Sequence, residues 1–311
     1  MATLYLTHPC LVEHDTGPGH PERPDRIRAV EKVLAHETFD ALIREEAPEG
    51  AEEDIARVHP RAYIEAIKNV APARGLVYLD GDTPMSPGTL NVILHAVGAG
   101  TRAVDAVMTG EVQNAFCGVR PPGHHAEPSR AMGFCIFNSA AIAAEYARAK
   151  HGAERVAVVD FDVHHGNGTQ AAFWSEKNLF YASSHQSPFY PGTGRTGETG
   201  VAGNIVNAPL RAGDGGREFR AAYKDLILPS LVNFAPDLLI LSAGFDAHQE
   251  DPLAEINLVE EDFSWVTYQL AEVAQKWSGG RIVSMLEGGY SLNGLARSTA
   301  VHVAALMDAG R

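Results

Sequence analysis

Short apolar runs alternate with helix-like segments along the whole chain, and this alternation constrains the fold more than any other feature. Two of the runs, residues 155–160 (RVAVVD) and 238–242 (LLILS), are apolar at consecutive positions rather than at every second one. A strand of that kind must be covered on both faces, which is typical of parallel sheets connected by helices. We therefore predict one domain, residues 1–311, built as an open, mostly parallel, doubly wound α/β sheet with helices on both faces.

The expected elements follow from these runs and from the residues at their ends. Ser86 before Pro87 suits a helix N-cap, and Gly110 can end the same helix in a left-handed conformation. Strands are expected at residues 3–6, 114–119, 154–160, 178–184, 204–209, 238–242 and 281–286. Helices are expected at residues 24–36, 60–70, 87–109, 139–150, 168–174, 215–234, 260–277 and 295–307.

The composition argues against several classes of protein. Lys and Arg number 25 against 39 Asp and Glu, a net charge of −14, and no basic stripe is present for nucleic acid. The three cysteines form no CxxC pair, which favours a reducing compartment. No segment has the pattern of a signal peptide or the ~18 apolar residues of a membrane span. We expect a cytoplasmic protein without nucleic-acid or membrane partners.

Four polar clusters each follow an expected strand. They are RPPGHHAEPS after Val119, DFDVHHGNGT after Val159, GFDAHQEDP after Ser242 and EGGYS after Leu286. In parallel α/β sheets, ligands bind beyond the carboxyl ends of the strands, where the loops converge. The sequence therefore predicts one site to which several strands deliver histidine, aspartate and tyrosine.

Asp162, His164 and Asp246 are the candidate metal ligands. In an extended segment, Asp160 would share one face with Asp162 and His164, because side chains alternate with a period of two. Two carboxylates and one imidazole leave a coordination position for water, as in catalytic zinc sites, and Fe²⁺ or Co²⁺ would also suit them. The alternative is a polar loop with ordinary hydrogen bonds. His248 is interpreted as a loop histidine outside the site.

His124, His125 and Tyr290 are the candidate catalytic residues. Two adjacent histidines are unusual in a core, because both imidazoles would need buried partners. Near a metal-bound water they would serve as general base and general acid. Tyr290 follows two glycines that permit a tight loop, and its hydroxyl would stabilise an oxyanion on a carbonyl. The alternatives are surface histidines and a packed tyrosine.

Two further motifs are not assigned a function. Residues 192–197 fit GxGxxG, but more loop and a strand follow rather than a helix, so no dinucleotide site is expected. Cys135 has no assigned basic partner and is expected to be a core thiol.

Taken together, the motifs resemble the histone deacetylase superfamily, which includes acetylpolyamine amidohydrolases and acetoin-utilisation proteins. Asn167 stands at a position where class I members carry aspartate, and in this respect the chain resembles class II members. With residues 20–24 (HPERP), the resemblance spans nearly the whole chain, and it implies an arginase/deacetylase-type fold and zinc-dependent removal of acyl groups from amines. It rests on residues 120–126 (RPPGHHA), 133–138 (GFCIFN), 160–169 (DFDVHHGNGT), 191–194 (PGTG), 244–246 (GFD) and 287–290 (EGGY).

The resemblance implies roles for the residues of the site. His125 matches the general base and Asn167 the residue behind it, while His124 matches its partner and Asp160 the carboxylate behind that partner. Tyr290 matches the tyrosine that polarises the acyl carbonyl. The residues that match the zinc ligands are Asp162, His164 and Asp246.

The resemblance also implies a substrate channel and an ion site. Gly133, Phe134 and Tyr190 match the channel walls, and Asp82 matches the rim acid that binds substrate backbone amides. A structural monovalent cation such as K⁺ would be held by the backbones of Asp160, Asp162 and His164 together with Ser183 and Ser184.

The expected substrate is an acyl-lysine peptide or protein, and the alternative is an acetylpolyamine or another cationic N-acyl-amine. Polyamine-preferring relatives tend to place glutamate where Leu253 stands, and many carry an additional loop at the entrance; neither is evident here. A ureohydrolase with two manganese ions would share the fold, but its bridging carboxylates are not found. A non-catalytic acyl-lysine binder of the same fold should have lost a metal ligand or Tyr290, and none of these is missing.

Overall fold

An eight-stranded sheet forms the centre of the structure, a computed structural model that describes residues 2–310. Its strands are β1 (Thr3–Thr7), β2 (Ile43–Glu46), β5 (Asn114–Cys117), β6 (Val156–Asp160), β7 (Leu179–Gln186), β8 (Ile205–Leu210), β9 (Leu238–Ala243) and β10 (Ile282–Leu286). They lie in the order β2-β1-β5-β10-β9-β6-β7-β8, and all seven neighbouring pairs are parallel. A separate antiparallel pair consists of β3 (Val77–Tyr78) and β4 (Pro84–Met85). The predicted open, parallel α/β sheet is confirmed.

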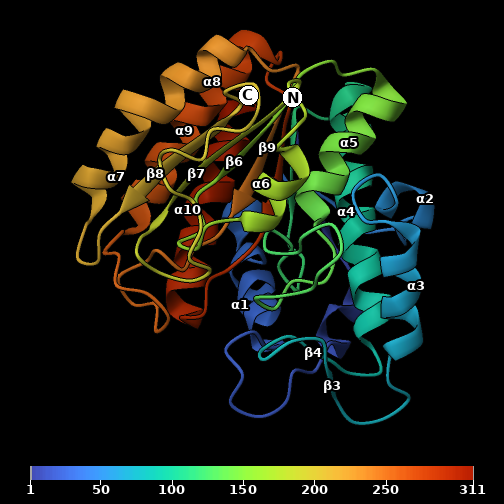
Figure 1. Cartoon of the computed structure of the whole chain (residues 1–311). Coiled ribbons are helices and arrows are strands. Elements are labelled where there is room, and N and C mark those ends of the chain that lie inside the picture. The colour runs from blue at the N-terminus through green and yellow to red at the C-terminus, as the bar shows by residue number, and fades with distance from the viewer. Residues whose placement is uncertain (1, 311) are drawn as a thin grey trace.

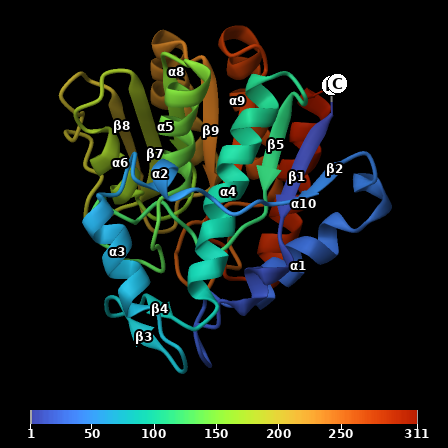
Figure 2. The same ribbon diagram turned by 90° about the vertical axis from the view of Figure 1, so that its right-hand side faces the viewer.

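Helices cover both faces of this sheet. They are α1 (Asp25–Leu34), α2 (Glu52–Ile55), α3 (Arg61–Val70), α4 (Thr89–Met108), α5 (Ser139–His151), α6 (Asn167–Phe173), α7 (Gly216–Ala222), α8 (Leu228–Phe234), α9 (Glu260–Trp277) and α10 (Leu292–Ala309), with short 3₁₀ turns η1 (Pro9–Glu13) and η2 (Glu37–Phe39). Helices α4 and α5 lie on one side of the sheet and α8, α9 and α10 on the other (Figures 1 and 2). Among residues 2–310, no helix has both the length and the apolar character that crossing a bilayer requires.

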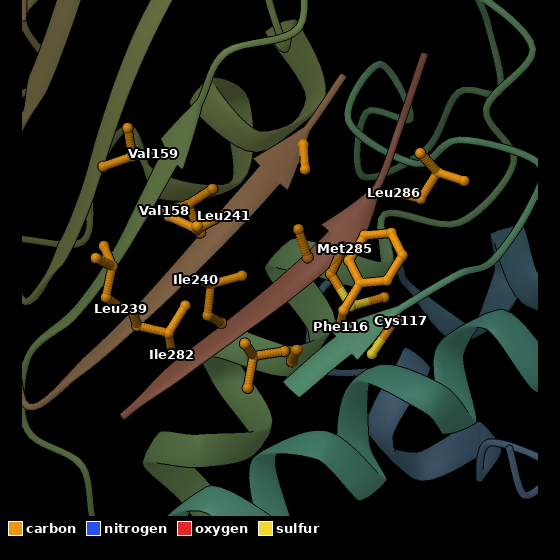
Figure 3. Close-up of a cluster of buried hydrophobic side chains, with 14 of the residues drawn as sticks. Phe116, Cys117, Val158, Val159, Leu239, Ile240, Leu241, Ile282, Met285 and Leu286 are labelled. Carbon is orange, nitrogen blue, oxygen red and sulfur yellow. The ribbon is translucent and has the colours of Figure 1, made fainter. Parts of the chain in front are cut away.

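The core follows from the continuous apolar strands. Val158 and Val159 of β6 are fully buried, as are Ile240 and Leu241 of β9 (Figure 3). Since consecutive strand residues point to opposite faces, each such pair buries one side chain under α4 and α5 and one under the helices opposite. Each fully buried aliphatic side chain contributes roughly 1.5–3 kcal/mol. The two-sided burial expected from the sequence is therefore present.

Two helix details differ from the sequence-based expectation. The helix expected from residue 87 begins at Thr89, and Ser86 does not cap it, because the Ser86 hydroxyl binds the Glu13 carbonyl oxygen and Thr89 Oγ1. The helix expected over residues 215–234 contains a π turn, Tyr223–Ile227, just before Pro229. Proline has no N–H to donate to the preceding turn, which accounts for the local change in helical pitch. Gly110 is left-handed as predicted, with φ of +76°.

The strand order brings the four polar clusters to one edge. Strands β5, β10, β9 and β6 are consecutive neighbours, so the loops after them are adjacent. The expectation that residues 160–164 continue as an extended segment is wrong, because β6 ends at Asp160. The Asp162 N–H turns back to donate to Asp160 Oδ1 at 3.1 Å, and the His164 N–H donates to Asp162 Oδ1 at 2.9 Å. The carboxylate of Asp160 consequently faces His124 rather than the side chains of Asp162 and His164.

Candidate active site

Asp162, His164 and Asp246 bring three donor atoms together at the carboxyl edge of the sheet. His164 Nδ1 lies 3.1 Å from Asp162 Oδ1 and 3.1 Å from Asp246 Oδ2, and all three residues are buried. A Cβ atom at Gly288 would collide with Asp246 Oδ2 and Asp162 Oδ2, so the close approach of the tyrosine loop to this centre requires glycine there.

The other carboxylate oxygens are held by backbone N–H groups. Gly288 N donates to Asp162 Oδ2 at 2.8 Å, and Val163 N donates to Asp246 Oδ1 at 2.8 Å. These bonds determine which oxygens face the centre. Burial and the neighbouring charge of Asp162 raise the pKa of Asp246 to about 7. Two buried carboxylates and an imidazole within 4.8 Å of one another fit a divalent cation of the zinc type.

His124 and His125 lie beside this centre, and their surroundings shift their pKa values in opposite directions. His124 Nδ1 is 3.0 Å from Asp160 Oδ2, and His124 Nε2 is 3.7 Å from Asp162 Oδ1. Burial alone would lower the pKa of His124, but the charges of Asp162 and Asp160 raise it well above its usual value. Burial and the nearby His124 and His164 hold the pKa of His125 well below its usual value. The environments push the two pKa values apart, as an acid–base pair requires.

Two polar side chains continue behind His125. His125 Nδ1 lies 2.8 Å from Asn167 Oδ1, so its N–H donates to the amide oxygen and its Nε2 keeps a lone pair. Asn167 Nδ2 donates in turn to Glu127 Oε1 at 2.8 Å. Sequence reasoning singled out Asn167 but missed Glu127, although Glu127 stands two positions after the tandem histidines. The neutral amide therefore has a carboxylate behind it.

Tyr290 is held through its backbone and through its ring. Its N–H donates to Asp251 Oδ2 at 2.7 Å, and the guanidinium of Arg26 lies 4.9 Å from the ring centroid. Gly289 before it has φ of +124°, a conformation that other residues rarely adopt. Burial raises the pKa of Tyr290 well above its usual value, so the phenol keeps its proton and can donate it in a hydrogen bond. Asp251 and Arg26 were both missed in the sequence.

A buried ion network supports this loop. Glu22 accepts from Arg120 at 2.8 and 2.6 Å and from Arg26 at 3.2 Å, and all three side chains are fully buried. Arg26 also donates to the carbonyl oxygens of Gly289 and Glu287. Buried charges persist only when paired and hydrogen-bonded in this way. The network thus links the HPERP segment to the loop that carries Tyr290.

A cavity of about 190 Å³ lies beside the cluster of Asp162, His164 and Asp246 and is lined in part by His164. Its lining includes His125, His164 and Tyr290, together with every residue expected in the substrate channel, namely Asp82, Gly133, Phe134, Tyr190 and Leu253, and with Phe189, which sequence reasoning missed. Phe134 has φ of +69°, which is strained for an aromatic residue, and Thr83 Oγ1 accepts its N–H at 3.1 Å. The ring of Phe134 meets that of Tyr290 edge-on at 5.7 Å.

The remaining candidates lie around this centre. Ser183 is the register partner of Asp160 across the β6–β7 pair, and Ser184 follows it, so these backbones are adjacent. His248 is buried but is not part of the cluster of Asp162, His164 and Asp246. Its Nδ1 accepts a hydrogen bond from the Glu250 N–H at 3.1 Å. His20 contacts Phe134 at 4.8 Å and so lies near the channel, whereas His185 is buried against Ser183 and Gly194. Cys135 is a buried thiol, as expected.

Comparison with known proteins agrees with this architecture. The family model described as histone deacetylase domain matches residues 20–306. A histone deacetylase-like amidohydrolase of Pseudomonas aeruginosa is 40% identical over 285 residues, covering 90% of this chain and 75% of that protein. An uncharacterised protein of Synechocystis sp. is 41% identical over 292 residues, covering 93% and 94%. The crystal structure of the HDA15 HD domain matches with a TM-score of 0.94 at 34% identity, covering 99% of this chain and 90% of that one.

Proposed function

Because this chain belongs to the histone deacetylase family, we propose that it hydrolyses the acyl amide of acyl-lysine residues in peptides or proteins with a zinc ion held by Asp162, His164 and Asp246. The observation that carries the proposal is the narrow cavity, whose lining joins aromatic walls to His164, His125 and Tyr290. We propose that residues 1–311 form one catalytic domain.

The reaction is difficult because an amide is a poor electrophile and an amine is a poor leaving group. A divalent ion at this position, when bound, polarises an acyl oxygen and lowers the pKa of a water ligand. His125 accepts a proton from the attacking water at Nε2, while Asn167 and Glu127 hold its ring in place.

Two further groups complete the chemistry. The Tyr290 hydroxyl donates to the oxyanion that develops on the acyl oxygen. The departing amine needs a proton, which the tandem histidines supply. The charges of Asp162 and Asp160 keep His124 protonated. His125 becomes protonated when it accepts the proton from water.

The channel residues support an acyl-lysine substrate. Phe134, Phe189 and Tyr190 give the cavity apolar walls for an alkyl chain, and Asp82 supplies a carboxylate for backbone amides of a peptide. Leu253 adds an apolar side chain, whereas a polyamine would be better bound by a carboxylate at this position. A peptide substrate is therefore favoured over an acylpolyamine.

Two finer points belong to the same proposal. A K⁺ ion would be coordinated by the backbone oxygens of Asp160, Asp162 and His164, together with Ser183 and Ser184. All three cysteines are free and buried, which supports the cytoplasm as the compartment.

Hydrolysis of a fluorogenic acetyl-lysine amide, with and without a chelator, tests the proposal. We expect the chelator to abolish hydrolysis and zinc to restore it. Asp246→Asn should be inactive, while the exposed control Asp40→Asn should behave as the parent protein. Turnover of an acetyl-lysine peptide should exceed that of N-acetylputrescine and N8-acetylspermidine. Hydrolysis that persists in chelator would refute the metal mechanism, and a strong polyamine preference would refute the substrate assignment.

A further inference from the structure

A second cluster of metal-ligating side chains lies outside the catalytic centre. It consists of His8, Cys10 and His95, each of which offers a donor atom within 4.8 Å of the other two. His8 is the N-cap of η1, Cys10 lies within η1, and His95 belongs to α4, which packs against η1. None of the three lines the catalytic cavity. We propose that they form a second metal site, which binds Zn²⁺ and ties η1 to α4.

One of the two imidazoles, that of His95, is already oriented for metal binding by the backbone. His95 Nδ1 lies 2.9 Å from the carbonyl oxygen of Asn91, so Nδ1 carries the proton and Nε2 keeps the lone pair. Backbone carbonyls orient ligating histidines in this way. The ring of His8 stacks on that of His95, with centroids 4.0 Å apart and an angle of 26°. His8 Nδ1 accepts the Cys10 N–H at 3.1 Å, so its proton is on Nε2. Coordination through Nε2 therefore requires the proton to move to Nδ1 and this hydrogen bond to break.

The donor set suits zinc rather than calcium or magnesium. A thiolate and two imidazoles are ligands that Zn²⁺ prefers, and three protein ligands leave a fourth position for water. Zn²⁺ binds the thiolate form of cysteine, so metal binding releases the thiol proton of Cys10. This release makes the affinity increase with pH.

The charges next to the cluster favour a cation. His8 lines a surface hollow of about 470 Å³ together with the exposed carboxylates of Glu31 and Glu46. Arg28 also lines the hollow, but its guanidinium is paired with Asp25 at 2.8 Å. The negative charges of these carboxylates therefore attract a cation from solvent toward His8.

The site has a structural consequence for the neighbouring ion network. Leu11, next to Cys10 in η1, accepts a hydrogen bond from Arg120 through its carbonyl oxygen at 2.7 Å. Arg120 in turn binds Glu22 behind the Tyr290 loop. A metal link between η1 and α4 stabilises this segment, so Zn²⁺ should raise the temperature of thermal unfolding.

Cobalt spectroscopy on the full chain tests the site. The protein is stripped with a chelator and titrated with Co²⁺, which replaces Zn²⁺ and gives a near-ultraviolet charge-transfer band only when a thiolate is bound. We expect two Co²⁺ ions per chain and a band that persists in Asp162→Asn, because the catalytic ligands include no sulfur. Cys10→Ser should lose the band and bind one ion fewer per chain. His95→Gln should need at least about tenfold more Co²⁺ to reach half of the full band intensity.

The matched controls are the other two cysteines. Cys117→Ser and Cys135→Ser should keep the band, and the latter excludes the cluster of His124, Cys135 and Glu287 as its source. Absence of the band in the parent protein, or a band that survives Cys10→Ser, overturns the proposal. If Cys10→Ser does not fold by circular dichroism, His95→Gln decides: parent-like Co²⁺ affinity overturns the proposal. No readout depends on hydrolysis, so the catalytic proposal is tested separately.

Discussion

The two polar side chains behind His125, Asn167 and Glu127, permit a direct test of what sets the pKa of the proposed catalytic base. Asn167 stands between His125 and Glu127, so the negative charge is one side chain removed from the imidazole. The double substitution Asn167→Asp/Glu127→Gln exchanges the carboxylate and the amide. It preserves the net charge and both hydrogen bonds, but it places the carboxylate in contact with His125 Nδ1.

The size of the effect follows from the geometry. The oxygen of residue 167 lies 2.8 Å from His125 Nδ1. With charge centres about 4 Å apart and an effective dielectric constant of about 20, the attraction is about 4 kcal/mol. At 1.36 kcal/mol per pKa unit, this corresponds to about 3 units. The charge of Glu127, which already acts from farther away, is lost, so we expect a net rise of about 1–3 units in the pKa of His125.

The assay is the pH dependence of kcat/KM for an acetyl-lysine peptide. The base acts unprotonated, so a higher pKa moves the acidic limb of the profile to higher pH by the same amount. Asn167→Asp alone puts two carboxylates in contact, one of which takes up a proton, and its shift should be smaller. An unchanged acidic limb in the double variant, at normal metal content, would refute the assignment of His125 as the base.

Three other substitutions test separate parts of the account. Tyr290→Phe keeps the ring but removes the hydroxyl, and should lower kcat by about 10²–10³ without loss of metal; turnover near that of the parent would exclude the oxyanion role. Arg26→Leu leaves Glu22 with an incomplete set of partners, and should lower the free energy of unfolding in urea by about 3–5 kcal/mol; a loss below about 1 kcal/mol, as for an exposed pair, would contradict the importance of the buried network. Leu253→Glu should increase the turnover of N8-acetylspermidine relative to an acetyl-lysine peptide, and an unchanged ratio would show that Leu253 does not set selectivity.

The sheet could be predicted because burial on both faces leaves a clear pattern in the sequence. Strands β6 and β9 are apolar at every position that the structure buries, except at Asp160, the last residue of β6, and at Ser242, the last residue but one of β9. Strand β2 was missed because its residues, IREE, are exposed or half-buried at the sheet edge. Charged side chains protect an edge strand from further pairing and remove the apolar signal.

The site was predictable where its residues stand in motifs after the strands, and not where it depends on distant contacts. Arg26 reaches the Gly289 carbonyl oxygen across 263 positions, and Asp251 binds the Tyr290 N–H across 39. Neither spacing has a local signature. Glu127 was close to the tandem histidines in sequence, but only the fold shows that its carboxylate contacts Asn167.

Anomalous diffraction at the zinc absorption edge, from crystals of protein assayed as active, tests the central claim most directly. We expect a peak within bonding distance of Asp162 Oδ1, His164 Nδ1 and Asp246 Oδ2, and no such peak in inactive Asp246→Asn. Crystals of fully active protein with no anomalous peak between these three residues would contradict the account.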